Sequence, residues 1–157
     1  MKEIALGSDP NASDLKETIK RHLTDLGYKW KDYGSDDPIY ANVAFDVCKA
    51  ITSGQSDRGI LMCGTGIGMC IAANKVPGIY AANCWDAYSV ERSRKSNNAN
   101  ILTLGSQVLG KETAKVLVTI WLQSEYSPGG RSEPKINRII EFEKNRFHQG
   151  GGVIHTG

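Results

Sequence analysis

The stretch GILMCGTGIGMCIAAN, from Gly59 to Asn74, decides the fold. An apolar run ends at Cys63, glycines follow at positions 64, 66 and 68, and a helix-forming segment begins at once. A run this apolar predicts a strand buried on both faces, as the strands of parallel sheets are. Glycines between a strand and a helix let successive backbone N–H groups turn inward and form an anion-binding nest. The stretch therefore predicts a parallel α/β sheet with a site at the carboxyl end of one strand.

The rest of the chain repeats the alternation of strand and helix. Short connections between such elements imply right-handed crossovers and a sheet covered on both sides. We predict an α/β protein, a Rossmann-like three-layer α/β/α sandwich with a five-stranded parallel sheet. One domain is expected over residues 1–145, followed by a flexible glycine-rich tail over residues 146–157. The predicted strands are 3–8, 29–33, 58–63, 78–84 and 100–105, and the predicted helices are 15–26, 38–50, 67–74, 111–124 and one beginning near 136.

Composition excludes several classes of partner. The 157 residues carry a net charge of +2, and the basic residues are scattered, so we expect no nucleic acid. No apolar stretch reaches 18 residues, so we expect no membrane span and a cytoplasmic location. Four cysteines form no CxxC pair, which favours free thiols, and three histidines lie too far apart for a metal site. We expect neither a metal nor another cofactor.

Cys63 is the candidate catalytic residue. A thiol at a helix N-terminus ionises readily, and the thiolate can act as a nucleophile or as a base. A nucleophile would want a histidine, and none lies near a predicted strand end. A base needs only an acidic C–H and donors that stabilise the enediolate, so proton abstraction next to a carbonyl is favoured. Packing alone is the usual role of a cysteine that ends a buried strand, and we expect it for Cys48, Cys70 and Cys84.

A nucleotide site is the weaker interpretation of the glycine turn. A dinucleotide fingerprint needs a glycine at position 69, where Met69 stands. The GK[ST] sequence of a phosphate-binding loop is also missing after the turn.

Four motifs together resemble one enzyme family. They are CGTGIGMCIAANKVPGI, the SD after the first strand, NNANILTLG, and the GGR before the last helix. The chain resembles the ribose-5-phosphate isomerase B and galactose-6-phosphate isomerase family from Lys2 to about Glu143. The resemblance implies a metal-free aldose–ketose isomerase that works through a cis-enediol. It also implies a small phosphorylated sugar as substrate and a homodimer or homotetramer whose active sites are shared between subunits.

The resemblance assigns roles to particular residues. Cys63 matches the base that moves a proton between C1 and C2, and Thr65 matches part of the enediolate cradle. Asn97 matches a substrate-binding asparagine that reaches into the partner's site. The remaining residues expected to bind substrate are Ser8, Asp9, the backbone of Gly64, Gly66, Ile67, Gly68 and Met69, and Ser96, Arg131 and Lys135.

Departures from the family pattern point to the substrate. Pro10 and Ser96 replace histidines, and the latter histidine is credited with opening the sugar ring. Gln107 stands where a phosphate-binding arginine is common, Lys135 where a second arginine follows GGR, and Asp37 where a tyrosine packs on substrate. A four-carbon sugar phosphorylated at O4 cannot close a ring, so we predict an isomerase of erythrulose 4-phosphate and erythrose 4-phosphate. The alternatives are a ribose 5-phosphate isomerase and a non-catalytic sugar-phosphate- or nucleotide-binding protein.

Overall fold

The computed structural model describes the backbone of residues 1–149 and the side chains of residues 1–146. The chain divides into two compact units, Met1–Tyr126 and a second that begins at Ser127. Within the described residues, no helix is long and apolar enough to cross a membrane. The cytoplasmic location stays a prediction.

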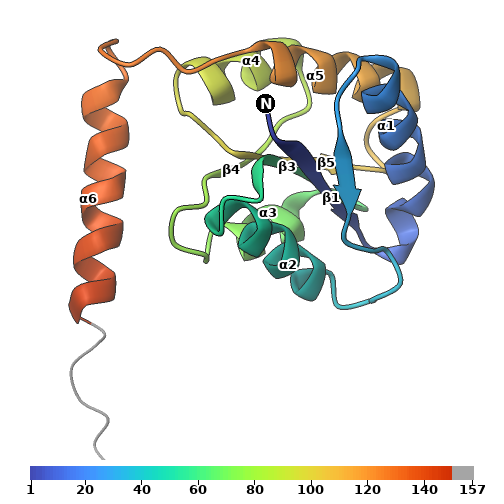
Figure 1. Cartoon of the computed structure of the whole chain (residues 1–157), viewed down its shortest axis with the longest axis horizontal. Helices are drawn as coiled ribbons and strands as arrows, with labels where there is room; N and C mark the ends of the chain where they lie inside the picture. Colours follow the sequence, from blue (N-terminus) through green and yellow to red (C-terminus); the bar gives the residue numbers. More distant parts are fainter. Residues whose placement is uncertain (150–157) are drawn as a thin grey trace, which may run out of the picture. The chain divides into compact units, whose positions relative to one another are not determined.

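The first unit is built on a parallel sheet of five strands (Figure 1). The strand order is β2-β1-β3-β5-β4, and every pair of neighbours is parallel. The strands are β1 (Glu3–Ser8), β2 (Trp30–Asp32), β3 (Ser56–Cys63), β4 (Ala81–Asn83) and β5 (Ile101–Gly105). The predicted five-stranded parallel sheet is confirmed.

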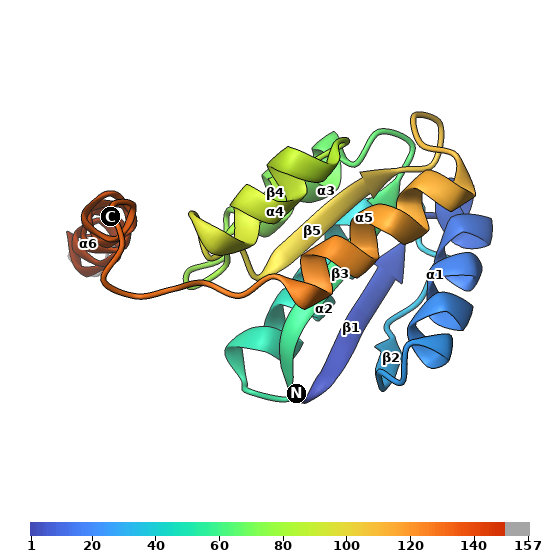
Figure 2. The same cartoon turned by 90° about the horizontal axis from the view of Figure 1, so that it is seen from above.

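Helices cover both faces of this sheet (Figure 2). One face packs on α1 (Ser13–Asp25), α4 (Ala87–Lys95) and α5 (Lys111–Gln123). The other face packs on α2 (Tyr40–Thr52) and α3 (Ile67–Ala73). A short 3-10 helix, η1 (Pro10–Ala12), joins β1 to α1. The three-layer α/β/α sandwich predicted from the sequence is therefore confirmed.

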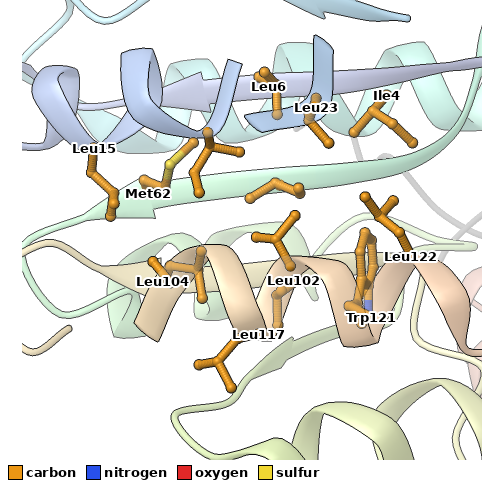
Figure 3. Packing of buried hydrophobic residues seen from close by; sticks show 14 of the residues in the cluster. Ile4, Leu6, Leu15, Leu23, Met62, Leu102, Leu104, Leu117, Trp121 and Leu122 are labelled. Atoms are coloured by element: carbon orange, nitrogen blue, oxygen red, sulfur yellow. The ribbon is translucent and has the colours of Figure 1, made fainter. Parts of the chain in front are cut away.

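The two cores follow from the alternation of side chains along β3. Ile60 and Met62 point to the α1–α4–α5 face, where Leu117, Trp121 and Leu122 of α5 meet the sheet (Figure 3). Leu61 and Cys63 point to the face that α2 and α3 cover. All four side chains are buried, which is why this strand is apolar in every position. The alternation also turns Cys63 toward α3.

The second unit holds one helix within the described residues, α6 (Glu133–Gln149). A turn precedes it, in which the N–H of Gly129 donates to the Glu133 carboxylate at 2.9 Å. The predicted tail begins at residue 146, but α6 continues through Gln149, and the other residues of the tail lie outside the described part of the chain.

The bounds of several elements differ from the prediction, and one helix was not predicted. The helix expected from Pro38 begins at Tyr40, because the Asp37 carboxylate accepts from the N–H of Ile39 and holds the chain in a turn before α2. The fourth strand is shorter than predicted, at three residues. Helix α4 was not predicted, because its sequence AYSVERSRK has little apolar periodicity and buries Ser93 and Arg94 beside Val90.

Candidate active site

The carboxyl ends of β1, β3 and β5 meet at one edge of the sheet. Cys63 of β3 pairs with Gly105 of β5. Met62, the residue before Cys63, pairs with Ser8 of β1. Backbone hydrogen bonds continue across the edge, from the N–H of Asp9 to the carbonyl of Met62 at 3.1 Å. The edge therefore brings the segments after three strands together, as ligand sites of such sheets require.

Cys63 lies at the centre of this edge. The residue is 5% exposed, and its Sγ accepts a hydrogen bond from the N–H of Gly66 at 3.1 Å. This hydrogen bond holds the thiol at the start of α3.

The glycine turn is fixed by close packing on β5. Gly66 has φ of +79°, and a Cβ there would lie 3.0 Å from the backbone of Leu104. A Cβ on Gly105 would lie 2.7 Å from the backbone of Thr65. Glycine is required at both positions because one backbone rests directly on the other. The direction of the turn's amide groups is therefore set by the sheet.

Thr65 has two functions in this turn. Its Oγ1 accepts from the N–H of Ile67 at 3.2 Å, which caps the first turn of α3. The side chain is exposed, and its O–H is left to donate outward. Because the amides of Gly66 and Ile67 already have acceptors within the turn and Met69 is fully buried, the amides of Gly64 and Gly68 are the better candidates for a cradle.

Two residues that the sequence analysis did not count among the substrate-binding residues also contact the turn. Asn83, at the end of β4, donates from Nδ2 to the carbonyl of Thr65 at 3.2 Å. The Gln107 carboxamide lies beside Gly64, where a Cβ would be 3.5 Å from Oε1. The backbone N–H of Gln107 donates to the Gly64 carbonyl at 3.0 Å. Their positions at or just after the carboxyl end of a strand could have predicted this contact from the sequence, since the carboxyl ends of parallel strands lie at one edge of the sheet.

Asp9 and Ser8 differ in what they can offer a ligand. Asp9 caps η1, with Oδ1 accepting from the N–H of Ala12 at 3.0 Å. Ser8 is fully buried, and its Oγ donates to the carbonyl of Asp9 at 2.9 Å. The expectation that Ser8 binds substrate is corrected: its hydroxyl is enclosed and supports the backbone of Asp9.

Ser96 and Asn97 lie far from Cys63 in the same chain. They follow α4 and precede β5, so they lie at the amino ends of the strands, opposite the edge that holds Cys63. Ser96 accepts a long hydrogen bond from Arg92 at 3.4 Å, and Asn97 is exposed. Arg131 and Lys135 belong to the second unit, where both are exposed, four residues apart at the start of α6.

The other three cysteines have surroundings suited to packing. Burial raises the pKa of Cys48 to about 12 and that of Cys84 to about 11, so both stay protonated at neutral pH. Burial also raises the pKa of Cys70, whose Sγ lies 3.5 Å from the carbonyl of Ala81. Among the described residues, no group of three or more histidine, cysteine or acidic side chains could hold a metal ion.

Comparison with known proteins places this site in a family. A profile of the Ribose/Galactose Isomerase family matches residues 4–139. The chain belongs to the ribose/galactose isomerase family. It is 49% identical over 153 residues to a D-erythrulose-4-phosphate isomerase of Pectobacterium atrosepticum, covering 95% of this chain and 100% of the relative. It is 43% identical over 148 residues to a ribose-5-P isomerase B of Listeria innocua, covering 92% and 99%.

Solved structures of the ribose/galactose isomerase family agree with the fold. Ribose-5-phosphate isomerase B of Clostridium thermocellum superposes with a TM-score of 0.87 at 42% identity, over 92% of this chain and 99% of that one. The chain is a sugar-phosphate isomerase, an enzyme that interconverts aldose and ketose phosphates. The family and the class of reaction expected from the sequence are confirmed.

Proposed function

We propose that the protein interconverts erythrulose 4-phosphate and erythrose 4-phosphate. The observation that carries this proposal is Ser96, which stands in the position of the family's ring-opening histidine and accepts a hydrogen bond from Arg92. A serine hydroxyl is a poor acid–base group near neutral pH, where histidine is suited to the task. The 49% identity to a D-erythrulose-4-phosphate isomerase supports the same substrate.

The reaction proposed is a proton transfer through a cis-enediol. The Cys63 thiolate removes a proton from C1 of the ketose, the electron pair of that C–H bond forms the C1–C2 double bond, and the C2 carbonyl becomes an enediolate oxygen. Amides of the glycine turn and the Thr65 hydroxyl stabilise this oxygen. Cys63 then returns the proton to C2 while the hydroxyl proton of O1 moves to O2, so that an aldehyde forms at C1 and a hydroxyl at C2. Asp9 binds sugar hydroxyls.

We propose further that two copies of the chain share each site. Within one chain Asn97 and Cys63 lie at opposite ends of the sheet, so a copy must supply Asn97 if it contacts substrate. Exposed apolar side chains support an interface near the glycine turn: Ile67 and Ile71 on α3, and Trp85 and Tyr88 at the start of α4.

A substrate series tests the proposed reaction. We expect kcat/KM for erythrulose 4-phosphate to exceed that for ribose 5-phosphate by at least about tenfold, because the pentose must first be opened. Ser96→His should leave the tetrulose reaction nearly unchanged and raise the activity on ribose 5-phosphate. A wild-type kcat/KM that is equal or higher for ribose 5-phosphate would favour the pentose enzyme. Absence of turnover with every sugar phosphate, despite binding, would favour the non-catalytic alternative.

A further inference from the structure

Tyr40, the first residue of α2, lies on the glycine turn. A Cβ built on Gly68 would be 2.4 Å from both Cζ and Oη of this tyrosine, closer than real atoms approach. Gly68 has no positive φ, so its backbone conformation does not require glycine. Glycine at position 68 therefore leaves the space that the end of the Tyr40 phenol ring occupies, and a larger residue there would displace the phenol.

The phenol group is also open to solvent. Tyr40 is 40% exposed, and none of the described residues forms a hydrogen bond with its hydroxyl. The neighbouring Thr65 and Ile67 are exposed as well, so this part of the turn is an open surface. The Tyr40 hydroxyl, which can both donate and accept a hydrogen bond, therefore lies beside the backbone amides of the glycine turn that follows Cys63.

Asp37 fixes the position of Tyr40. Its Oδ1 accepts from the N–H of Ile39 and its Oδ2 from Nδ2 of Asn42, both at 2.8 Å. These hydrogen bonds, that from Asn42 first, lower the pKa of Asp37, so the carboxylate keeps both partners at neutral pH. Asp37 thus holds the start of α2, and the first side chain of that helix is directed onto Gly68.

We propose that Tyr40 is a substrate-binding residue that determines specificity. Its hydroxyl hydrogen-bonds an oxygen of the sugar chain beyond the reacting C1–C2 pair. A neutral hydroxyl suits a sugar hydroxyl, whereas a phosphate is better bound by cations. This inference rests on the proposed isomerase reaction and adds to it a residue that contacts the substrate from α2.

Kinetics of five variants on erythrulose 4-phosphate test this inference. Tyr40→Phe should raise KM about three- to tenfold with little change in kcat, because one neutral hydrogen bond to the substrate is lost. Tyr40→Ala should raise KM further. Gly68→Ala keeps the backbone amide of residue 68 but displaces the Tyr40 phenol. The increases in KM caused by Gly68→Ala and by Tyr40→Ala should therefore not add in the variant that carries both changes. Phe45→Ala, an exposed aromatic of the same helix, is the matched control.

The outcomes separate this inference from the proposed function. If the wild type is active and both Tyr40 variants match the Phe45→Ala control in KM, the role of Tyr40 is overturned and the reaction stands. Additive effects of Tyr40→Ala and Gly68→Ala would overturn it too. If the wild type does not isomerise sugar phosphates, the proposed function fails and this role of Tyr40 fails with it.

Discussion

Cys63 is the residue on which the proposed reaction depends. Cys63→Ser keeps the volume and the acceptor for the N–H of Gly66, but a hydroxyl is too weak a base at neutral pH. We expect turnover to fall by about 10²–10⁴, the usual contribution of a general base. The measurement is kcat together with exchange of the C1 proton of the ketose in D₂O. Cys70→Ser is the control and should stay active; unchanged proton exchange in Cys63→Ser would exclude the thiolate as the base.

The sequence predicted those site residues that follow directly from strand ends. Cys63 and Asp9 lie at one edge because parallel strands end together, and that rule needs only the order of strands. Tyr40 and Asn83 were missed because their contacts with the turn cross from one element to another. Burial of Ser8 was missed for a related reason, since only the folded chain shows what covers a hydroxyl.

At the level of elements, ion pairs join the end of β2 to α1. Lys16, whose side chain is 3% exposed, donates to Asp32 at 2.8 Å, and Lys20 donates to the other oxygen at 3.0 Å. Burial by itself would raise the pKa of Asp32, but hydrogen bonds from Lys16, Gly34 and Lys20 bring it below the ordinary value. The ion pair therefore stabilises the fold above the unfolded-state pKa of about 4 and less as the pH falls through the folded-state value.

Asp32→Asn should lower the free energy of unfolding by roughly 3 kcal/mol at pH 7, because Lys16 is left buried without its counter-charge. Urea unfolding at pH 7 and at pH 3 measures the effect, and the deficit should shrink at pH 3, which lies below the unfolded-state pKa of about 4, because protonation of the unfolded wild-type chain reduces the stabilisation there. Glu17→Gln, on the exposed side of the same helix, is a control with a small expected effect. A deficit that is equal at both pH values would contradict the electrostatic cause.

Elements with strong apolar patterns were predicted well, and polar ones were not. β1 has the predicted bounds, since its side chains from Ile4 to Ser8 are all buried. Helix α4 was missed because Arg94 occupies a buried position where an apolar residue is usual. Its guanidinium donates a hydrogen bond to the carbonyl of Ala99 at 2.6 Å. Tertiary hydrogen bonds of this kind satisfy a buried charge and leave no periodic signal in the sequence.

At the scale of the whole molecule, the separation of Asn97 from Cys63 predicts complementation between subunits. In a two-fold dimer, a Cys63→Ser chain paired with an Asn97→Ala chain has one intact site and one doubly altered site. Two variants that are each nearly inactive should therefore recover about a quarter of wild-type turnover on random mixing after refolding.

The matched control is a mixture of Cys63→Ser with Thr65→Ala. Both residues come from the same side of one site, so no heterodimer contains an intact pair and no recovery is expected. Recovery in this control, or sedimentation of the wild type as a monomer, would count against shared sites.

The strand order also constrains how the chain folds as it is synthesised. β5 lies between β3 and β4 in the sheet, although β4 precedes it in the chain. β4 pairs with β5 and with no other strand of the described sheet, so on the ribosome it has no template until residue 105 has emerged. β2, β1 and β3 can associate earlier, because each has a partner within the first 63 residues. The glycine turn after β3 rests on β5, so the turn beside Cys63 can take its final conformation only when this last strand is inserted.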